Sequence, residues 1–143
     1  MFISKNAAET FEWGKSFAQK LNPPLFIGLT GPLGAGKTLL TKAIAAGLGH
    51  NPDEVHSPTF TIMNIYEKGK KMYHFDFYRL ESKEDFNCLG LEEFFYDPNA
   101  IVLVEWAEKA KDLIPKDAIL IHIEFGKSET ERKITLSHEP SRV

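Results

Sequence analysis

Hydrophobic residues along the chain form two kinds of pattern, and the two kinds alternate. Short and almost uninterrupted apolar runs lie at 25–30 and 101–104, and such runs are typical of parallel strands covered on both faces. The first run is followed by glycines and then, from Lys37 to Leu48, by apolar residues at helical spacing. This alternation predicts an α/β fold, with helices layered around a sheet that is partly parallel.

The N-terminal residues predict a strand and a capped helix. A short strand is expected at Phe2-Ile3, and Asn6 with Glu9 three residues later forms a capping-box pattern that opens a helix. The Asn22-Pro23-Pro24 sequence should end this helix. The residues expected on its buried face are Ala7, Phe11, Gly14, Ala18 and Leu21.

The remaining pattern predicts a hairpin and a closing pair of strands. Strands are expected at 60–66 and 71–78, and the short spacing between them favours a hairpin. Ser82 with Asp85 has the pattern of another helix cap. The last expected elements are a helix at 107–113 that ends at Pro115, and two strands at 118–125 and 133–136.

Length and composition favour one domain. The chain has 143 residues, close to the roughly 150 of one compact domain. Its 43% hydrophobic and 26% charged residues are an ordinary globular mixture. We therefore expect residues 1–143 to form a single domain.

Charge and cysteine content narrow the class of protein further. Seventeen Lys and Arg against 20 Asp and Glu give a net charge of −3, which cannot supply the cationic field that grips a phosphate backbone. Tight, direct binding of nucleic acid is therefore not expected. The one cysteine, Cys88, can form neither an internal disulfide nor a thiolate zinc cage. The sequence shows no signal peptide and no membrane-spanning apolar run, so we expect a cytoplasmic protein.

Residues Gly31 to Thr38 match the phosphate-binding pattern G-x-x-x-x-G-K-[ST] in full, between a predicted strand and a predicted helix. In that setting, the backbone N–H groups of residues 34 to 38 can converge on phosphate oxygens at the positive end of the helix. Lys37 would place its charge against the β and γ phosphates, and the Thr38 hydroxyl would bind Mg²⁺. This motif favours a nucleotide site over a glycine turn that only joins strand to helix.

A magnesium–nucleotide site also needs an acidic group at the tip of a neighbouring strand. Glu105 directly follows a predicted buried strand, and Asp76 lies at the centre of a His-Phe-Asp-Phe-Tyr-Arg sequence. We expect Glu105 to serve the outer shell of the metal and Asp76 to orient water. The alternatives are a solvated strand end for Glu105 and an exposed carboxylate paired with Arg79 or Lys71 for Asp76.

Other residue types bear on the reaction. Only three of the 17 cationic side chains are arginines, whereas small-molecule kinases commonly clamp two phosphorylated ligands with several guanidinium groups. A metabolite kinase is therefore an alternative that the sequence disfavours. Ser82 to Asp85 only approximates the guanine-reading N-K-x-D pattern, which favours adenine. A second alternative is a nucleotide-gated binding module, because a small open site excludes water poorly and hydrolyses slowly alone.

Two further features are candidates for a switch or a partner contact. Ser57, Thr59 and Thr61 flank a proline soon after the predicted P-loop helix, and such hydroxyls can contact a γ phosphate or its metal and relax after hydrolysis. A plain turn with a hydroxyl cap is the alternative. Trp106, next to Glu105, is either a core aromatic or a ring presented to a partner or the nucleotide.

In combination, these motifs resemble those of the TsaE (YjeE) family of small bacterial P-loop ATPases over nearly the whole chain. The resemblance rests on residues 31–38, 57–61, 74–79, 89–95 and 104–106. The family usually reads Gly-Asp-Leu-Gly-Ala-Gly-Lys-Thr-Thr in the phosphate loop. Pro32 replaces that Asp and Leu39 the second Thr, so the roles of these two family side chains do not carry over, whereas Lys37 and Thr38 remain.

The resemblance implies a P-loop NTPase-like, three-layer fold with a mostly parallel central sheet and an antiparallel hairpin. It also implies Mg²⁺-dependent ATP hydrolysis in support of threonylcarbamoyladenosine (t6A) formation next to the anticodon of tRNAs that read codons starting with A. TsaE-like proteins bind the TsaB–TsaD heterodimer, and their ATPase cycle is thought to reset that complex. The protein would then reach tRNA only through its partners, which agrees with its net charge.

By position, the resemblance assigns roles to individual residues. Thr38 and Glu105 correspond to the Mg²⁺ residues of the family, Asp76 to an acid needed for activity, and Trp106 to a functional tryptophan. Arg132 falls where the family has an arginine that contacts the nucleotide, after a loop of different length. The residues implied for the phosphate loop are Gly34, Ala35, Gly36, Lys37, Thr38 and Leu39.

Overall fold

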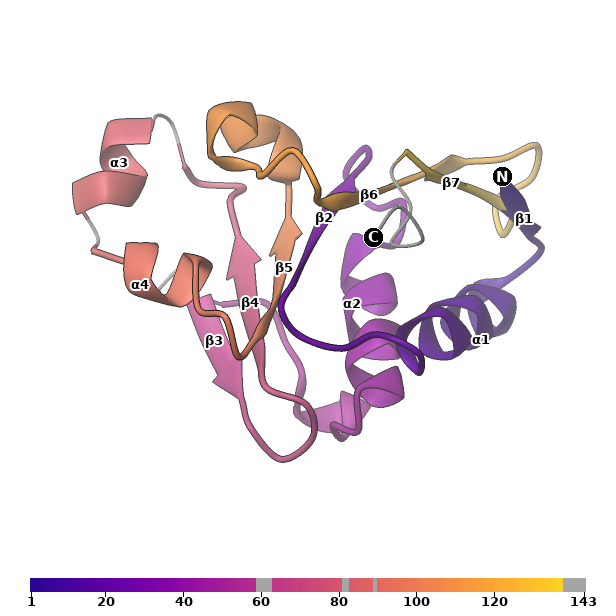
Figure 1. Cartoon of the computed structure of the whole chain (residues 1–143). Coiled ribbons are helices and arrows are strands. Elements are labelled where there is room, and N and C mark those ends of the chain that lie inside the picture. The colour runs from indigo at the N-terminus through magenta and orange to yellow at the C-terminus, as the bar shows by residue number, and fades with distance from the viewer. Residues whose placement is uncertain (59–62, 81–82, 89, 138–143) are drawn as a thin grey trace.

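A single seven-stranded sheet organises the protein in its computed structural model, which describes residues 1–58, 63–80, 83–88 and 90–137 (Figure 1). The strands lie in the order β1-β7-β6-β2-β5-β4-β3. Their bounds are β1 Phe2–Ser4, β2 Leu25–Thr30, β3 Met63–Tyr66, β4 Met72–Asp76, β5 Ile101–Glu105, β6 Ile119–Phe125 and β7 Arg132–Leu136. The central four strands, β6, β2, β5 and β4, are parallel, and the strands outside them pair antiparallel.

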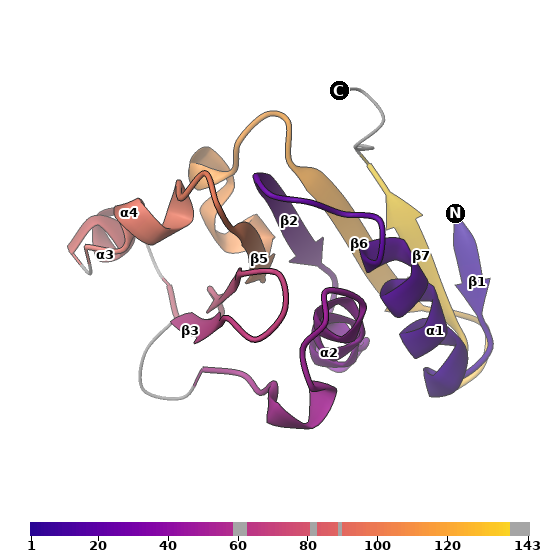
Figure 2. The same cartoon turned by 60° about the horizontal axis from the view of Figure 1, so that its bottom comes forward.

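Helices pack on both faces of this sheet, which confirms the α/β fold of three layers. One face carries α1 (Ala7–Ala18) and α2 (Lys37–Gly47), which pack against each other (Figures 1 and 2). The other face carries α3 (Lys83–Cys88), α4 (Glu92–Phe95) and the 3-10 helix η2 (Ala107–Leu113). A short 3-10 turn, η1 (Pro52–Glu54), follows α2.

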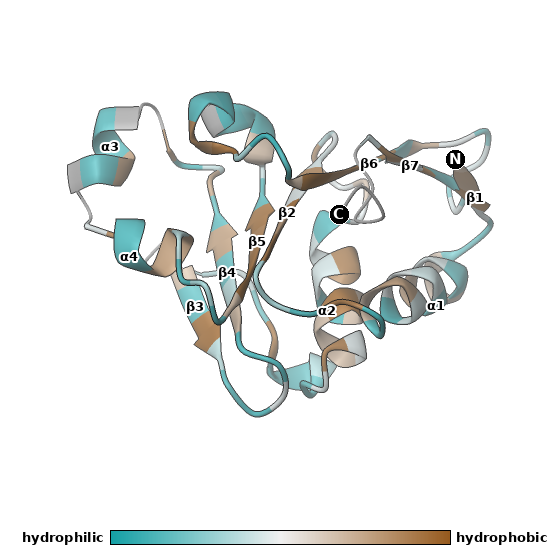
Figure 3. Ribbon diagram, viewed as in Figure 1, coloured by the Kyte–Doolittle hydropathy of each residue, from teal (hydrophilic) through white to brown (hydrophobic). Residues whose placement is uncertain are grey.

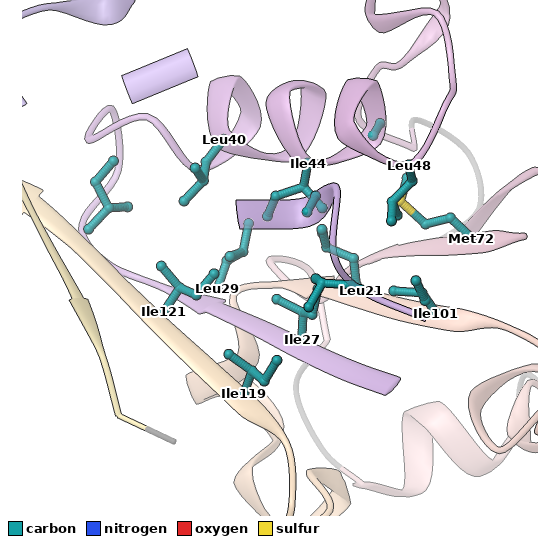
Figure 4. Close-up of a cluster of buried hydrophobic side chains, with 14 of the residues drawn as sticks. Leu21, Ile27, Leu29, Leu40, Ile44, Leu48, Met72, Ile101, Ile119 and Ile121 are labelled. Carbon is teal, nitrogen blue, oxygen red and sulfur yellow. The ribbon is translucent and has the colours of Figure 1, made fainter. Parts of the chain in front are cut away.

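The core beneath α2 is built from aliphatic side chains. Figure 4 shows Leu40, Ile44 and Leu48 pointing from the α2 segment toward Ile27 and Leu29 of the central strand. These side chains are at most 2% exposed, so each removes most of its apolar surface from water. This burial holds α2 against the sheet.

The core on the opposite face is largely aromatic. Phe75 and Phe77 alternate with polar positions along and just after β4, and both rings contact Phe86 of α3 and Phe95 of α4. The ring centroids lie 5.3 to 6.4 Å apart, within the range of stacked and edge-to-face pairs. Figure 3 shows brown, hydrophobic stretches along strands such as β2 and β6, and more hydrophilic residues on the flanking helices.

Most of the expected elements are confirmed within one to three residues, and one detail is wrong. The expected helix at 107–113 is confirmed and is a 3-10 helix, with Lys109 N donating to Trp106 O three residues earlier. In α1, Ala7 is exposed and Thr10 is buried in its place, because the Thr10 hydroxyl hydrogen-bonds Ser4 Oγ at 2.7 Å. The helix α4 was not expected. Residues 60–62 of the expected hairpin and Ser82 of the expected cap lie outside the described residues.

A glycine sets the distance between α1 and α2. A Cβ placed on Gly14 would lie 2.8 Å from Ala43 Cβ and 2.8 Å from Leu40 Cδ1. Ordinary van der Waals contact between carbons needs about 3.5 Å or more. The two helices can therefore approach this closely only without a side chain at position 14.

We predict that Gly14→Ala lowers the free energy of unfolding by about 1–3 kcal/mol through overpacking. Helix propensity alone would raise the free energy of unfolding by up to about 1 kcal/mol. The sign of the measured change therefore distinguishes overpacking from helix propensity. Urea unfolding of the variant measures this difference. Adding Ala43→Gly to Gly14→Ala should recover part of the loss, and strictly additive losses would contradict the contact.

Candidate active site

The loop between β2 and α2 has the conformation that its glycines allow. Gly31, Gly34 and Gly36 have φ angles of +142°, +82° and +115°, which L side chains rarely adopt. At Gly31 a Cβ would also lie 2.0 Å from Ile123 O. The loop leads directly into the N-terminus of α2, whose first N–H groups have no intrahelical partner and can face an anion.

Lys37, the first residue of α2, folds back over this loop. Its ammonium donates to the carbonyls of Gly31 and Pro32, the second at 2.9 Å, and lies 3.8 Å from the centroid of the Trp106 ring. The residue is 5% exposed. Burial lowers the pKa of Lys37, and the nearby carboxylates of Glu108, Glu105 and Asp76 oppose that shift. A cation thus lies at the floor of the site, surrounded by acidic groups.

Glu105, the last residue of β5, is buried rather than solvated. It is 2% exposed, and its Oε1 accepts a hydrogen bond from Thr38 Oγ1 at 3.2 Å. Its Oε2 lies 3.2 Å from Thr41 Oγ1 and 2.6 Å from His74 Nε2. The alternative of a solvated strand end is therefore wrong. The carboxylate instead joins β5 to α2 and β4.

Asp76, the last residue of β4, lies beside Glu105 in the parallel register of β4 and β5. Its Oδ1 accepts a hydrogen bond from Tyr78 N at 2.9 Å. Burial raises the pKa of Asp76, and the charge of Glu105 raises it further. Lys71 does not neutralise it, because Lys71 Nζ pairs with Asp97 at 3.2 Å. The alternative in which Asp76 is paired with Lys71 is therefore wrong.

These side chains open into one cleft of about 510 Å³. Of the expected site residues, nine line this cleft: Gly34, Gly36, Lys37, Thr38, Leu39, Ser57, Asp76, Glu105 and Trp106. Trp106 packs partly against the aromatic core and also contacts Tyr78, with the ring centroids 4.9 Å apart. Trp106 is thus partly a core aromatic and also lines the cleft, and its contact with a partner or a nucleotide stays a prediction. Thr59 and Thr61 lie outside the described residues.

Ala35, a residue of the loop, and Arg132, which contacts the loop, do not line the cleft. Ala35 is 1% exposed, and its N–H donates to Pro32 O at 3.2 Å, so this amide closes a turn inside the loop. Its carbonyl accepts from Arg132 Nε at 2.9 Å. Arg132 therefore braces the loop from the hairpin of β6 and β7, and the expected convergence of residues 34 to 38 does not include the Ala35 amide.

Thr38 and Glu105 offer a hydroxyl and a carboxylate side by side, and these are the hard oxygen donors that Mg²⁺ takes. The donor set in the cleft therefore fits this ion. Within the described ranges, no three His, Cys, Asp or Glu side chains cluster as ligands of a metal ion.

Comparisons with known proteins match the chain over most of its length. The family model described as "Threonylcarbamoyl adenosine biosynthesis protein TsaE" matches residues 4–134. This chain belongs to the TsaE family. Proteins named tRNA threonylcarbamoyladenosine biosynthesis protein TsaE are similar to it: that of Haemophilus influenzae is 39% identical over 119 residues, 79% of this chain and 74% of the relative. That of Treponema pallidum is 34% identical over 135 residues, 94% and 98% of the two chains.

A solved structure supports the same assignment. The crystal structure of Bacillus subtilis YdiB superposes with a TM-score of 0.78 at 34% identity and covers 99% of this chain and 86% of that one. The expected resemblance to the TsaE family and the expected fold class are therefore both confirmed. The family acts in the biosynthesis of threonylcarbamoyladenosine, so a role in tRNA modification is shown for this TsaE-family chain at the level of the pathway.

Several residues of the TsaE-family site were missed from the sequence. Tyr78 and Arg79 line the cleft, and Thr41 and His74 bind Glu105 from behind. Periodicity places the last two on the same faces as predicted residues, although it does not pair them with Glu105. Thr41 follows Thr38 by three residues on one helix face, and His74 precedes Asp76 by two residues on one strand face.

The described helices of this TsaE-family chain include none with the length and apolar character needed to cross a bilayer.

We predict that Asp76→Asn folds at least as stably as the wild type at neutral pH. Because burial raises the pKa of Asp76 above its unfolded value, the ionised carboxylate costs stability above that raised pKa. The cost disappears as the pH falls below the unfolded value of about 3.9. The advantage of the variant should therefore be present at pH 7 and vanish near pH 4.

Thermal unfolding at several pH values measures this, with Asp53→Asn at an exposed position as the matched control. A variant that is less stable than the wild type at pH 7 would show that the carboxylate is a stabilising group.

Proposed function

We propose that this TsaE-family protein is an Mg²⁺-dependent ATPase that supports t6A formation by binding and resetting the TsaB–TsaD complex in the cytoplasm. The observation that carries the proposal is the contact between Thr38 and Glu105 beside the Lys37 ammonium, at the end of a glycine loop and the start of α2. Phosphoryl transfer needs little covalent help from a protein, so positioning and charge stabilisation suffice.

Each side chain has a distinct part in the proposed reaction. The loop glycines let the backbone approach the phosphates, and Lys37 would place its charge on the oxygens that become more negative as the terminal phosphoryl group leaves ADP. Thr38 and Glu105 would hold Mg²⁺, which when bound neutralises phosphate charge. Asp76 would orient the attacking water or accept its proton, a role that its raised pKa favours.

The openness of the cleft supports a dependence on partners. Leu33 is 71% exposed and Tyr78 is 50% exposed at its rim, where a docked protein could cover them. Hydrolysis in a site open to water is expected to be slow, and closure by a partner would strengthen every electrostatic interaction inside it. We infer that tRNA is reached through TsaB–TsaD, because the net charge of −3 offers no broad cationic surface.

We predict that Lys37→Ala lowers the rate of ATP hydrolysis by at least about 100-fold, because it removes a charge aimed at the transferring group. Phosphate release measures the rate, and thermal unfolding checks that the loop survives the loss of the two carbonyl contacts. Lys42→Ala is the matched control, since Lys42 lies on the same helix and does not line the cleft. Wild-type turnover in Lys37→Ala would remove the loop from the mechanism.

We further predict that TsaB–TsaD raises the rate of phosphate release from ATP by this protein. The same assay separates the alternatives. Binding of ATP without release of phosphate, with or without the heterodimer, would identify a nucleotide-gated binding module. A phosphorylated metabolite found by mass spectrometry, in place of free phosphate, would identify a kinase.

A further inference from the structure

The two oxygens of the Glu105 carboxylate have different neighbours. Oε1 accepts from Thr38 Oγ1, and this hydroxyl belongs to a residue that lines the cleft. Oε2 turns toward the interior, where Thr41 and His74 contact it. Since the carboxylate is 2% exposed, the protein interior rather than water decides how it is oriented.

Of the two interior contacts, only the one from His74 is not shared with another acceptor. The Thr41 hydroxyl has a single hydrogen, and its oxygen lies 2.9 Å from Lys37 O and 3.2 Å from Glu105 Oε2, so it cannot donate fully to both. His74 Nε2 lies at 2.6 Å from Oε2. The ring therefore supplies the stronger hold on this oxygen.

The rest of the His74 ring makes no competing polar contact in the described part of the chain. His74 is 0% exposed, and its Nδ1 is buried with no hydrogen-bond partner there. A buried N–H without an acceptor costs more free energy than an unused lone pair, so the hydrogen belongs on Nε2, where Oε2 accepts it. Register brings His74 to this position, because it lies on β4 two residues before Asp76, which is opposite Glu105.

We propose that His74 is a positioning residue for the metal-binding carboxylate: its Nε2–H holds Oε2 of Glu105 toward the interior, so that Oε1 faces Thr38 and the Mg²⁺ site. This inference rests on the proposed function. Groups that orient metal ligands typically change metal affinity by about 10- to 100-fold when removed. The ring itself is 0% exposed and does not line the cleft, so it would act only through Glu105.

The first test uses calorimetry to measure ATP binding at a series of Mg²⁺ concentrations, under conditions without turnover. Its result is the Mg²⁺ concentration at which the effect of Mg²⁺ on ATP binding is half-maximal. His74→Leu should raise this concentration by about 10- to 100-fold, while binding of ATP in the absence of Mg²⁺ stays within about twofold. His74→Gln keeps a donor near the Nε2 position and should recover most of the loss. His50→Leu, at another buried histidine with hydrogen bonds outside the cleft, is the control and should leave the Mg²⁺ dependence unchanged.

The second test needs neither metal nor a variant of His74. Ring-¹⁵N NMR of the metal-free protein should show His74 as the Nε2–H tautomer, and Glu105→Gln should shift its Nε2 signal. A His74 ring protonated on Nδ1 alone would overturn the inference even if His74→Leu fails to fold.

The outcomes separate this inference from the proposed function. An unchanged Mg²⁺ midpoint in folded His74→Leu, with normal Mg²⁺–ATP binding by the wild type, would overturn the positioning role alone. Absence of any Mg²⁺-dependent ATP binding by the wild type would overturn the proposed function and the inference together.

Discussion

The parallel register of β2, β5 and β4 is the constraint on which the whole site depends. Glu105 lies opposite Leu29 of β2 on one side and Asp76 of β4 on the other. Since β2 ends one residue after Leu29 and leads into the glycine loop, all three strands deliver their last residues to one edge of the sheet. A slip of one residue in any pair would turn a carboxylate to the opposite face, among the aromatic side chains.

This register brings charged side chains together in a largely buried part of the protein. Lys37, Glu105 and Asp76 share one end of the sheet, and Glu108 Oε2 accepts from Gly31 N at 3.2 Å behind them. Burying charged groups is costly unless they are paired and hydrogen-bonded. The rest of the fold therefore stabilises this charged cluster, and the cluster is not what stabilises the fold. The two hydrophobic cores on either side of β5 supply that support.

Local patterns predicted the elements and the loop, because the information for them is local. The apolar run at 25–30, the glycines after it and the helical spacing from Lys37 are sufficient to specify a strand, a turn and a helix. The partners of Glu105 were not predictable in the same way. His74 and Glu105 are 31 residues apart, and only the pairing of β4 with β5 brings them together. Arg132, 97 residues from Ala35, illustrates the same limit, since its contact with the loop follows from where β7 lies.

The conformation of Lys37 bears on which ligand the cleft can take. Its ammonium already has two carbonyl acceptors and the face of Trp106, so a ligand that draws it away must replace all three interactions. A single neutral acceptor would give one hydrogen bond in exchange for these interactions, and a buried ammonium that loses acceptors is costly. A polyphosphate brings several anionic oxygens to the same amine and to the free amides of α2 together. These contacts support the proposed triphosphate ligand over a nucleoside or a single weak anion.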